Sequence, residues 1–457
     1  KTGYVLGCVG GLGEKTTPRS LNRATQSIRQ TGSAIKPIAV VGPAIQKRII
    51  TASSIYDDTE KDFPGGYHPV DYSKALGKIT VRRAIESSQN IPFVEIMQEL
   101  KPSVSMDYLE RLGITTLTEE DNNLSLALGG LQKGISPLEM AAAYAAIAND
   151  GEYIEPVFYQ NIKNHSGETI ITAKQDTRRV FSKETAFILK DLLTQPVEGS
   201  NGTATYCKIN GIDVAAKTGT TDSNYDRWLC GFTNYYACAA WYGFDDPERI
   251  SFPGTNPAGQ LFSGIMKQIH KDKEDSLFEE PDNIVHAKVC RTSGLLATNK
   301  CSNTYSEIFV KDHLPDTCDA HQNQYTICTE SGKLANEFCP ASTRETRSAN
   351  YVVEKERLGL WTTPGINTTT TSAPTEYCTI HKKVEEVKKP VEEKPKDDTE
   401  KKPDSNNTAK PDSGSNTTGN ATTGGNTTVG NTTGGGNTTG GNTTTGGNTT
   451  NGGNTTQ

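Results

Sequence analysis

One tetrapeptide near the start of the chain pairs a hydroxyl with an amine. Ser33 and Lys36 form the only Ser-x-x-Lys in the sequence, and residues three apart on a helix lie on one face, so the two side chains can meet. Pro37 is tolerated only in the first turn of a helix, which predicts that Ser33 lies at a helix N-terminus. Unpaired N–H groups and the positive end of the helix dipole favour a developing oxyanion there. The pattern fits a nucleophilic serine with a lysine base, although a capping serine followed by a solvent-facing lysine fits it too.

Two further motifs offer groups that could complete such a site. Ser88 and Asn90 have a Ser-x-Asn spacing, which carries no weight alone because the same spacing recurs elsewhere in the chain. A Lys-Thr-Gly-Thr sequence occupies residues 217–220, at the end of a predicted strand. A glycine in a strand indicates close approach of another backbone or a ligand. The lysine and threonines beside it offer a cation and hydroxyls to a substrate carboxylate.

The elements that must position these motifs can be predicted locally. Ser136 is a plausible N-cap, Pro137 fits the first helical position and Glu139 completes a capping box, so we expect a helix that ends near residue 149. Residues 212–217, 227–232 and 236–244 are typical of short strands, the last two joined as a hairpin. The predicted fold class is α+β, with an antiparallel sheet flanked by helices.

The first residues predict an incomplete hairpin. Residues 1–3 fit a turn and residues 4–9 a strand, whose partner would precede the turn. The sequence also has no initiator Met. We therefore expect it to begin within a longer protein.

Taken together and in this order, the three motifs resemble the active-site motifs of the penicillin-interacting serine acyl-transferases. The surrounding sequence resembles, more narrowly, the transpeptidase domain of class A penicillin-binding proteins, over roughly the first 270 residues. The segments that carry this resemblance are residues 22–25, 29–33, 127–130, 134–144 and 241–246. The resemblance implies the fold shared by serine β-lactamases and penicillin-binding transpeptidases.

The resemblance also implies a mechanism. Ser33 would attack the carbonyl of the penultimate D-alanine of a peptidoglycan stem peptide, and an amine of a neighbouring stem peptide would resolve the acyl-enzyme. β-Lactam antibiotics would acylate Ser33 as substrate mimics. Burial of Lys36 beside Lys217 would lower its pKa enough for it to act as the base, and the N–H groups of Ser33 and Thr220 would form the oxyanion hole. The expected catalytic residues are Ser33, Lys36, Ser88 and Lys217, the expected substrate-binding residues are Asn90, Thr218, Gly219 and Thr220, and no cofactor is expected.

Other partners follow from what this family contains. Its class A members carry an N-terminal membrane anchor and a glycosyltransferase domain, which this sequence lacks, so we expect the missing N-terminal part of the same protein as a partner. The implied location is the extracytoplasmic face of the bacterial membrane. A net charge of −7 gives no electrostatic reason to bind nucleic acid.

Related functions share these motifs. A serine β-lactamase or a D,D-carboxypeptidase is the alternative within the superfamily. A β-lactamase needs a base for its deacylating water, and Glu86 and Asn90 surround the second motif instead of following it on a separate loop. The non-enzymatic alternative is an inactive scaffold that binds the cell wall.

Composition divides the chain into three predicted regions. Residues 1–285 mix apolar patterns with turn residues and would form the transpeptidase domain. Residues 286–381 hold six of the ten cysteines in two similar copies. Residues 382–457 pass from a charged, proline-broken stretch into Gly-Asn-Thr repeats, which we predict to be a disordered tail because they contain too few apolar residues to fold.

Each copy in the cysteine region contains three cysteines and one histidine. The first has Cys290, Cys301, Cys318 and His321, and the second has Cys328, Cys339, Cys378 and His381. Disulfides suit an extracytoplasmic location, but three cysteines per copy is an odd number for them. Three cysteines with one histidine also fit a zinc site, with only loose agreement in ligand spacing. The sequence leaves both alternatives open.

Overall fold

The computed structural model describes residues 2–14, 16–252, 254–321, 324–348 and 374–382. Its α-helices within these ranges are α1 (Arg23–Gln26), α2 (Gly42–Gln46), α3 (Val81–Ser87), α4 (Ile91–Leu100), α5 (Pro102–Arg111), α6 (Pro137–Ala148), α7 (Lys183–Glu198) and α8 (Pro257–Ile269). Its strands are β1 (Ile55–Asp57), β2 (Lys78–Thr80), β3 (Glu152–Ile154), β4 (Asn161–Lys163), β5 (Thr169–Thr172), β6 (Thr177–Arg179), β7 (Ala215–Thr220), β8 (Asp226–Phe232), β9 (Ala237–Gly243), β10 (Ile284–Cys290), β11 (Thr304–Val310), β12 (Gln324–Cys328) and β13 (Arg344–Ser348). The predicted disordered tail, from residue 383 onward, lies outside the described residues.

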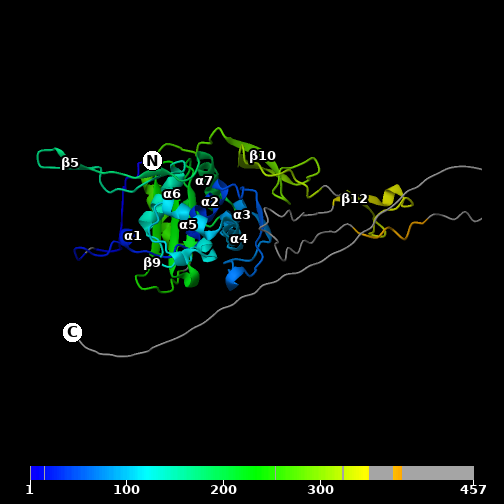
Figure 1. The fold of residues 1–457 in the computed structure, drawn as a ribbon, viewed down its shortest axis with the longest axis horizontal. Coiled ribbons are helices and arrows are strands. Elements are labelled where there is room, and N and C mark those ends of the chain that lie inside the picture. The colour runs from blue at the N-terminus through cyan, green and yellow to red at the C-terminus, as the bar shows by residue number, and fades with distance from the viewer. Residues whose placement is uncertain (1, 15, 253, 322–323, 349–373, 383–457) are drawn as a thin grey trace, which may run out of the picture. The chain divides into compact units, whose positions relative to one another are not determined.

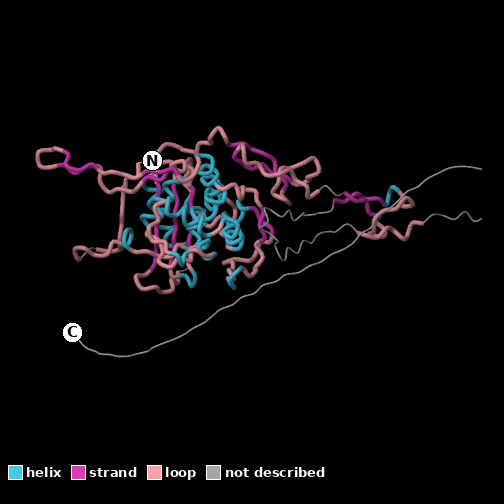
Figure 2. The backbone as a smooth tube through the Cα atoms, viewed as in Figure 1, coloured by secondary structure: helices cyan, strands magenta, loops and turns pink. Residues whose placement is uncertain are grey.

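A three-stranded antiparallel sheet, ordered β7-β8-β9, lies at the centre of the main domain (residues 2–283), with helices around it (Figures 1 and 2). Successive side chains of a strand point to opposite faces. Trp228 and Phe232 of β8 therefore join the large core that includes α6, while Leu229 joins a second core with Phe262 of α8. The sheet has helices on both faces, which confirms the predicted α+β class.

The helix from Pro137 to Ala148 has the predicted boundaries. Ser136 accepts a hydrogen bond from the backbone N–H of Glu139, and the Glu139 carboxylate accepts one from the backbone N–H of Ser136. This reciprocal capping box satisfies donors that the first helical turn leaves unpaired. The helix then packs against β8 and β9.

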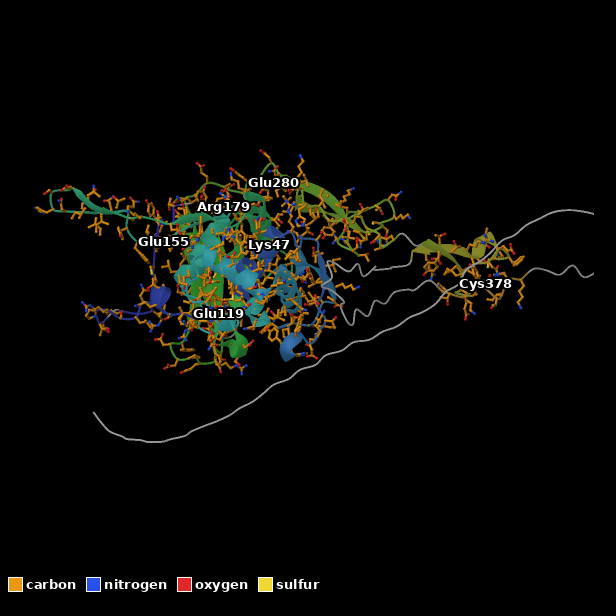
Figure 3. The ribbon with its side chains drawn as sticks, viewed as in Figure 1. Lys47, Glu119, Glu155, Arg179, Glu280 and Cys378 are labelled. Atoms are coloured by element: carbon orange, nitrogen blue, oxygen red, sulfur yellow. The ribbon has the colours of Figure 1, made fainter. Side chains whose placement is uncertain are left out.

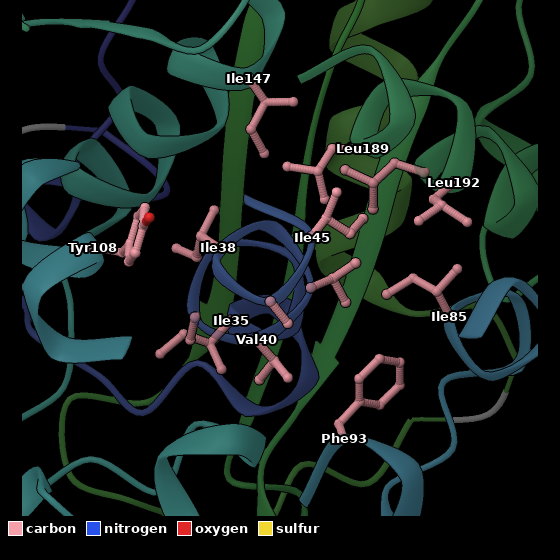
Figure 4. Packing of buried hydrophobic residues seen from close by; sticks show 14 of the residues in the cluster. Ile35, Ile38, Val40, Ile45, Ile85, Phe93, Tyr108, Ile147, Leu189 and Leu192 are labelled. Carbon is pink, nitrogen blue, oxygen red and sulfur yellow. The ribbon is translucent and has the colours of Figure 1, made fainter. Parts of the chain in front are cut away.

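A continuous helical segment, Gly32–Gln46, runs through the middle of the large core. It consists of a 3₁₀ turn η1 (Gly32–Ile35), a π-helical turn η2 (Pro37–Val41) and α2. Apart from Ser33, Lys36 and Gln46 its side chains are apolar on all faces, as expected for a helix that packs on every side. Figure 4 shows Ile35, Ile38 and Ile45 on this segment, surrounded by side chains from other helices.

The start of this segment differs from a regular α-helix. In an α-helix the N–H of Pro37 would bond to the carbonyl of Ser33, but proline has no N–H. The backbone N–H of Lys36 bonds to that carbonyl instead, in the 3₁₀ pattern. Ser33 thus lies in the first turn of the helical segment, as predicted, but in a tighter turn.

Two strand predictions need correction. Residues 4–9 do not form a strand: the bridge at Tyr4 pairs with Val157 alone, and Leu6 and Val9 are exposed. A strand needs hydrogen-bonded pairing along its length, which Val157 does not supply. The strand predicted at residues 212–217 begins at Ala215 and continues to Thr220, because its pairing with β8 extends that far. The other two strands and their hairpin agree with the prediction to within a residue.

The cysteine region contains two small hairpins of the same design. β10 pairs with β11 in the first cysteine module (residues 284–321), and β12 pairs with β13 in the second (described residues 324–348 and 374–381). The bridges of Leu296 to Val289 and Thr317 in the first module recur as the bridges of Leu334 to Ile327 and Tyr377 in the second. The two sequence copies therefore share one local topology.

The first cysteine module packs on the main domain. Ile284 and Ile308 belong to the large core, and the buried carboxylate of Glu307 bonds to the guanidinium of Arg82. The Ser53 hydroxyl donates to the carbonyl of Gly294 at 2.7 Å. Arg82 lies in α3, the helix that ends next to Ser88.

Candidate active site

Side chains from the three motifs meet where η1, the end of α3 and β7 come together. The amine of Lys217 donates to Ser88 Oγ at 2.6 Å and to the carbonyl of Thr218 at 3.1 Å. Ser88 has a left-handed backbone, with φ of 63°, at the residue that ends α3. This conformation costs energy for a non-glycine residue and is concentrated at functional sites. Lys217 of the third motif therefore binds Ser88 of the second motif directly.

The amine of Lys36 binds the second motif from the other side. Within the described residues it donates to the carbonyl of Ser88 at 3.0 Å, the carbonyl of Gln89 at 2.6 Å and Oδ1 of Asn90 at 2.7 Å. It also lies over the ring of Phe93, 4.9 Å from the ring centre. Lys36 is fully buried, whereas Ser33 is half-buried, so the amine lies inside the protein and the hydroxyl near its surface.

Two glycines let the backbone around Ser33 contact β7. A Cβ on Gly32 would lie 2.2 Å from the carbonyl oxygen of Thr220, and one on Gly219 would lie 2.3 Å from that of Thr31. Real Cβ atoms are not found this close to other atoms, so both positions require glycine. The close backbone approach that the glycine at 219 predicted is confirmed, and the partner backbone is that of the residues just before Ser33.

The remaining predicted binding residues line the same junction. Asn90 donates through its amide to the carbonyl of Val70 at 2.6 Å. The hydroxyl of Thr218 shares a hydrogen bond with that of Thr203 at 3.0 Å, and Thr220 accepts one from Arg227 at 2.9 Å. The structure thus brings the three motifs together: hydrogen bonds join Lys36 to Asn90 and Lys217 to Ser88, and the turn that contains Ser33 packs against β7.

Burial lowers the pKa of both lysines. The pKa of Lys36 is lowered well below its ordinary value, first by burial and second by repulsion from Lys217, and Asp71 and Asp58 oppose part of this shift. Burial lowers the pKa of Lys217 to about 7. A lysine becomes a base at neutral pH only when its pKa falls in this way.

Two carboxylates that lie outside the three motifs support the site. Asp71 accepts a hydrogen bond from the backbone N–H of Asn90, and Asp58 accepts one from the side chain of Gln89 at 2.5 Å. Burial raises the pKa of Asp71 to about 6, against the hydrogen bond from Asn90. Both hold the loop of the second motif in place. They lie in no recognisable motif, so no sequence signal could have identified them.

The cysteine and histidine candidates form a separate group. Cys290, Cys301, Cys318 and His321 come together in the first cysteine module. They are not among the side chains that contact the two lysines. All ten cysteines are free thiols in the structure.

Comparison with known families identifies both regions. Residues 1–248 match the model of the penicillin-binding protein transpeptidase domain. The chain belongs to this family. Residues 280–323 match the C-terminal domain of penicillin-binding protein 1A, which covers the first cysteine module. The predicted resemblance to the transpeptidase domain of class A penicillin-binding proteins is confirmed.

Curated relatives carry the same family name. Penicillin-binding protein 1A of Clostridium botulinum is 32% identical over 363 residues, which are 76% of this chain and 44% of that protein. Penicillin-binding protein 1F of Bacillus subtilis is 36% identical over 293 residues, or 62% of this chain and 39% of that protein. The chain therefore spans less than half the length of these relatives.

Solved structures share the fold. Penicillin-binding protein 1A from Haemophilus influenzae is 27% identical and has a TM-score of 0.56, over 65% of this chain and 50% of that one. PonA1 from Mycobacterium tuberculosis has a TM-score of 0.52 at 24% identity, over 59% of this chain and 75% of that one, which supports the fold alone. Within the described residues, no helix combines the length and apolar character needed to cross a membrane.

Proposed function

We propose that this chain is a serine D,D-transpeptidase that cross-links peptidoglycan stem peptides ending in D-Ala-D-Ala. The observation that carries the proposal is the 2.6 Å hydrogen bond from Lys217 Nζ to Ser88 Oγ, next to a second buried amine on Lys36. This arrangement supplies a nucleophile, a base and a proton carrier at one strand edge. Acyl transfer needs these three groups together.

Acylation begins at Ser33. Its Oγ bonds to the carbonyl carbon of the penultimate D-alanine while its proton passes to Lys36. In its neutral form the Lys36 amine has two protons, so it donates to only two of its three oxygen neighbours and its lone pair can accept the proton of Ser33. Lys217 donates to Ser88 Oγ, so the hydroxyl proton of Ser88 is free to move to the nitrogen of the terminal D-alanine as the peptide C–N bond breaks. The proton held by Lys36 then replaces the one that Ser88 gave away. Free D-alanine leaves, and an ester joins the stem peptide to Ser33.

An amine of a neighbouring stem peptide completes the reaction. Its nitrogen bonds to the ester carbon, its proton passes through Ser88 and Lys36, and the bond from the carbon to Ser33 Oγ breaks. Ser33 regains its proton and a new peptide bond forms. Over the whole cycle, the amine of the neighbouring stem peptide replaces the amine of D-alanine at the acyl carbon.

Recognition uses the neighbouring polar groups. Lys217 and the hydroxyls of Thr218 and Thr220 bind the terminal carboxylate, while the Asn90 amide holds the peptide. The hydroxyl of Thr220 accepts its hydrogen bond from Arg227, which leaves its own proton free to donate. The N–H groups of Ser33 and Thr220 stabilise the oxyanion, each worth about 10²–10³ in rate. β-Lactam antibiotics acylate Ser33 as mimics of this substrate.

The substrate sets the location. Peptidoglycan stem peptides lie outside the cytoplasmic membrane, so the chain acts at the extracytoplasmic face, with the anchor and partner domain that its longer class A relatives contain.

A β-lactamase is a poorer match to the contacts. Its deacylating water needs a free carboxylate, but Glu86 accepts hydrogen bonds from Arg83 at 2.7 Å and from the backbone of Asn201 at 2.9 Å. Both oxygens of Glu86 are therefore engaged in structural contacts. A stoichiometric burst with a chromogenic cephalosporin fits the transpeptidase, whereas rapid continuous turnover fits the β-lactamase.

Covalent labelling tests the proposal. Ser33→Ala should abolish labelling by a fluorescent penicillin, because the acylated oxygen is gone. Ser182→Ala is the matched control, since Ser182 also lies at the start of a helix, and it should label normally. Circular dichroism checks that both variants fold. Labelling that persists in folded Ser33→Ala would overturn the proposal.

A further inference from the structure

Each cysteine module gathers three sulfurs and one imidazole nitrogen into a group that could surround a single ion. In both groups all four atoms lie within 4.8 Å of one another. The first group is Cys290, Cys301, Cys318 and His321, and the second is Cys328, Cys339, Cys378 and His381. Figure 3 labels Cys378 among the side chains of the second module.

The spacing of these atoms suits tetrahedral coordination. Zinc bonds of about 2.3 Å to sulfur and 2.0 Å to nitrogen place neighbouring ligand atoms roughly 3.5–3.8 Å apart. Cys290 Sγ lies 3.1 Å from a ring nitrogen of His321. Cys328 Sγ and Cys378 Sγ each lie 3.5 Å from Nδ1 of His381. An ion at the centre of either group would need only small adjustments.

The sulfurs receive hydrogen bonds at corresponding positions. The backbone N–H of Thr298 donates to Cys301 Sγ at 3.4 Å, and that of Asn336 donates to Cys339 Sγ at 3.4 Å. In the first group the Ser293 hydroxyl also donates to Cys318 Sγ at 3.1 Å. Donors of this kind stabilise the negative charge of a metal-bound thiolate.

The two copies reach the same group across different chain lengths. The second cysteine follows the first by 11 residues in both copies, and the histidine follows the third cysteine by three. The third cysteine follows the second by 17 residues in the first copy and by 39 in the second. Both copies therefore contain the same four ligand residues although the segment that connects them differs in length. This indicates that the fold preserves the ligand set.

We propose that each cysteine module binds one Zn²⁺ through three thiolates and one neutral imidazole. Sulfur and nitrogen ligands in a closed tetrahedral set are typical of structural zinc sites. Binding releases one proton from each of the three thiols, so each loaded site has a net charge of −1. No electron transfer takes place. A disulfide between two cysteines of the same group would leave the third cysteine of that group unpaired.

The first site would hold the module on the main domain. The turn after Cys290 contains Gly294, whose carbonyl accepts from Ser53, and a Cβ at Gly294 would lie 2.1 Å from the Ser53 carbonyl oxygen. Zinc bound at Cys290 would fix this turn and the contact that it makes.

Metal content tests the proposal in the full chain. Protein purified under reducing conditions with zinc, then freed of unbound metal, should retain two zinc ions by elemental mass spectrometry, one for each group. After denaturation with a chelator, ten thiols should react. Cobalt titration should show tetrahedral thiolate bands that saturate at two equivalents. Reduced wild-type protein that binds no zinc, or native protein whose mass and thiol count show disulfides within the groups, would overturn the proposal.

Variants assign each ion to its group. His321→Ala and His381→Ala should each lower the zinc content from two ions to one, and the double variant should bind none. His313→Ala is the matched control because His313 is outside both groups, and it should retain two. Circular dichroism checks folding, and if His321→Ala does not fold, Cys301→Ser replaces it. Folded variants that keep both ions would contradict the assignment.

Discussion

The main domain and the cysteine modules are held together by different means. In the main domain, aliphatic and aromatic side chains from almost every helix form one large buried cluster, with the helical segment of Ser33 at its centre. Ile284 and Ile308 of the first module belong to that large cluster, but the separate buried cluster in the described part of each module consists of cysteines, joined in the first module by Ala320. Burial of apolar area contributes about 25 cal/mol per Å², so clusters this small supply little stability.

This difference explains where each kind of chemistry occurs. A large apolar core can bury two lysines and shift their pKa values, because it excludes water and offsets the cost of burial elsewhere. A module without such a core needs a cross-link, and a bound ion supplies one. In the two proposals, the same chain uses burial to shift the pKa values of its lysines and metal binding to stabilise its cysteine modules.

Replacing Lys36, the proposed base, should have the largest effect. Lys36→Met keeps the side-chain volume but removes the amine, so penicillin acylation should fall by about 10³-fold. Lys190→Met is the matched control, because Lys190 is equally enclosed but pairs with Asp150 away from the site. The acylation rate of each variant is measured by penicillin labelling that is quenched at a series of times. A Lys36→Met rate within about twofold of wild type would assign the base to another group.

Removing the charged contact between the two regions should have an intermediate effect. Glu307→Gln removes the charge that Arg82 contacts, and the free energy of unfolding should fall by about 1–3 kcal/mol, limited by the remaining pair of Arg82 with Asp191. Denaturant unfolding measures the change. Glu280→Gln, at an exposed pair with His286, is the control and should cost less than about 0.5 kcal/mol. Equal effects would show that the buried contact does not couple the module to the main domain.

The pH dependence of stability should show the smallest effect. Lys217 has a folded pKa of about 7 and an unfolded value near 10.4. The unfolded state therefore binds more protons above pH 7, so stability rises with pH. Between about pH 6.5 and 8, wild type should gain about 1 kcal/mol more than Lys217→Met. Thermal and denaturant unfolding at each pH give the comparison, and parallel curves would contradict the lowered pKa of buried Lys217.

Much of the site could be predicted from short motifs. Ser33 and Lys36 lie one helical turn apart, and their relation follows from helix geometry. Gly219 predicts close backbone approach because no side chain fits there. Asp58 and Asp71 could not be predicted, since they act on the second motif only through contacts made after folding. The failed strand at residues 4–9 has the same origin, because pairing depends on distant residues.

The sequence by itself determined the local elements and their chemistry: the capped helix at Pro137, the strands with their hairpin, the paired serine and lysine, and the repeated set of cysteines and histidine. These depend on neighbours within a few residues, where backbone geometry leaves few choices. Only the tertiary structure decided that Lys36 faces the second motif, that Lys217 bonds to Ser88, and that four ligand atoms gather in each module. Such contacts join residues far apart in the chain, and they form because packing the core and pairing the strands leave an arrangement that satisfies most of the described buried polar groups.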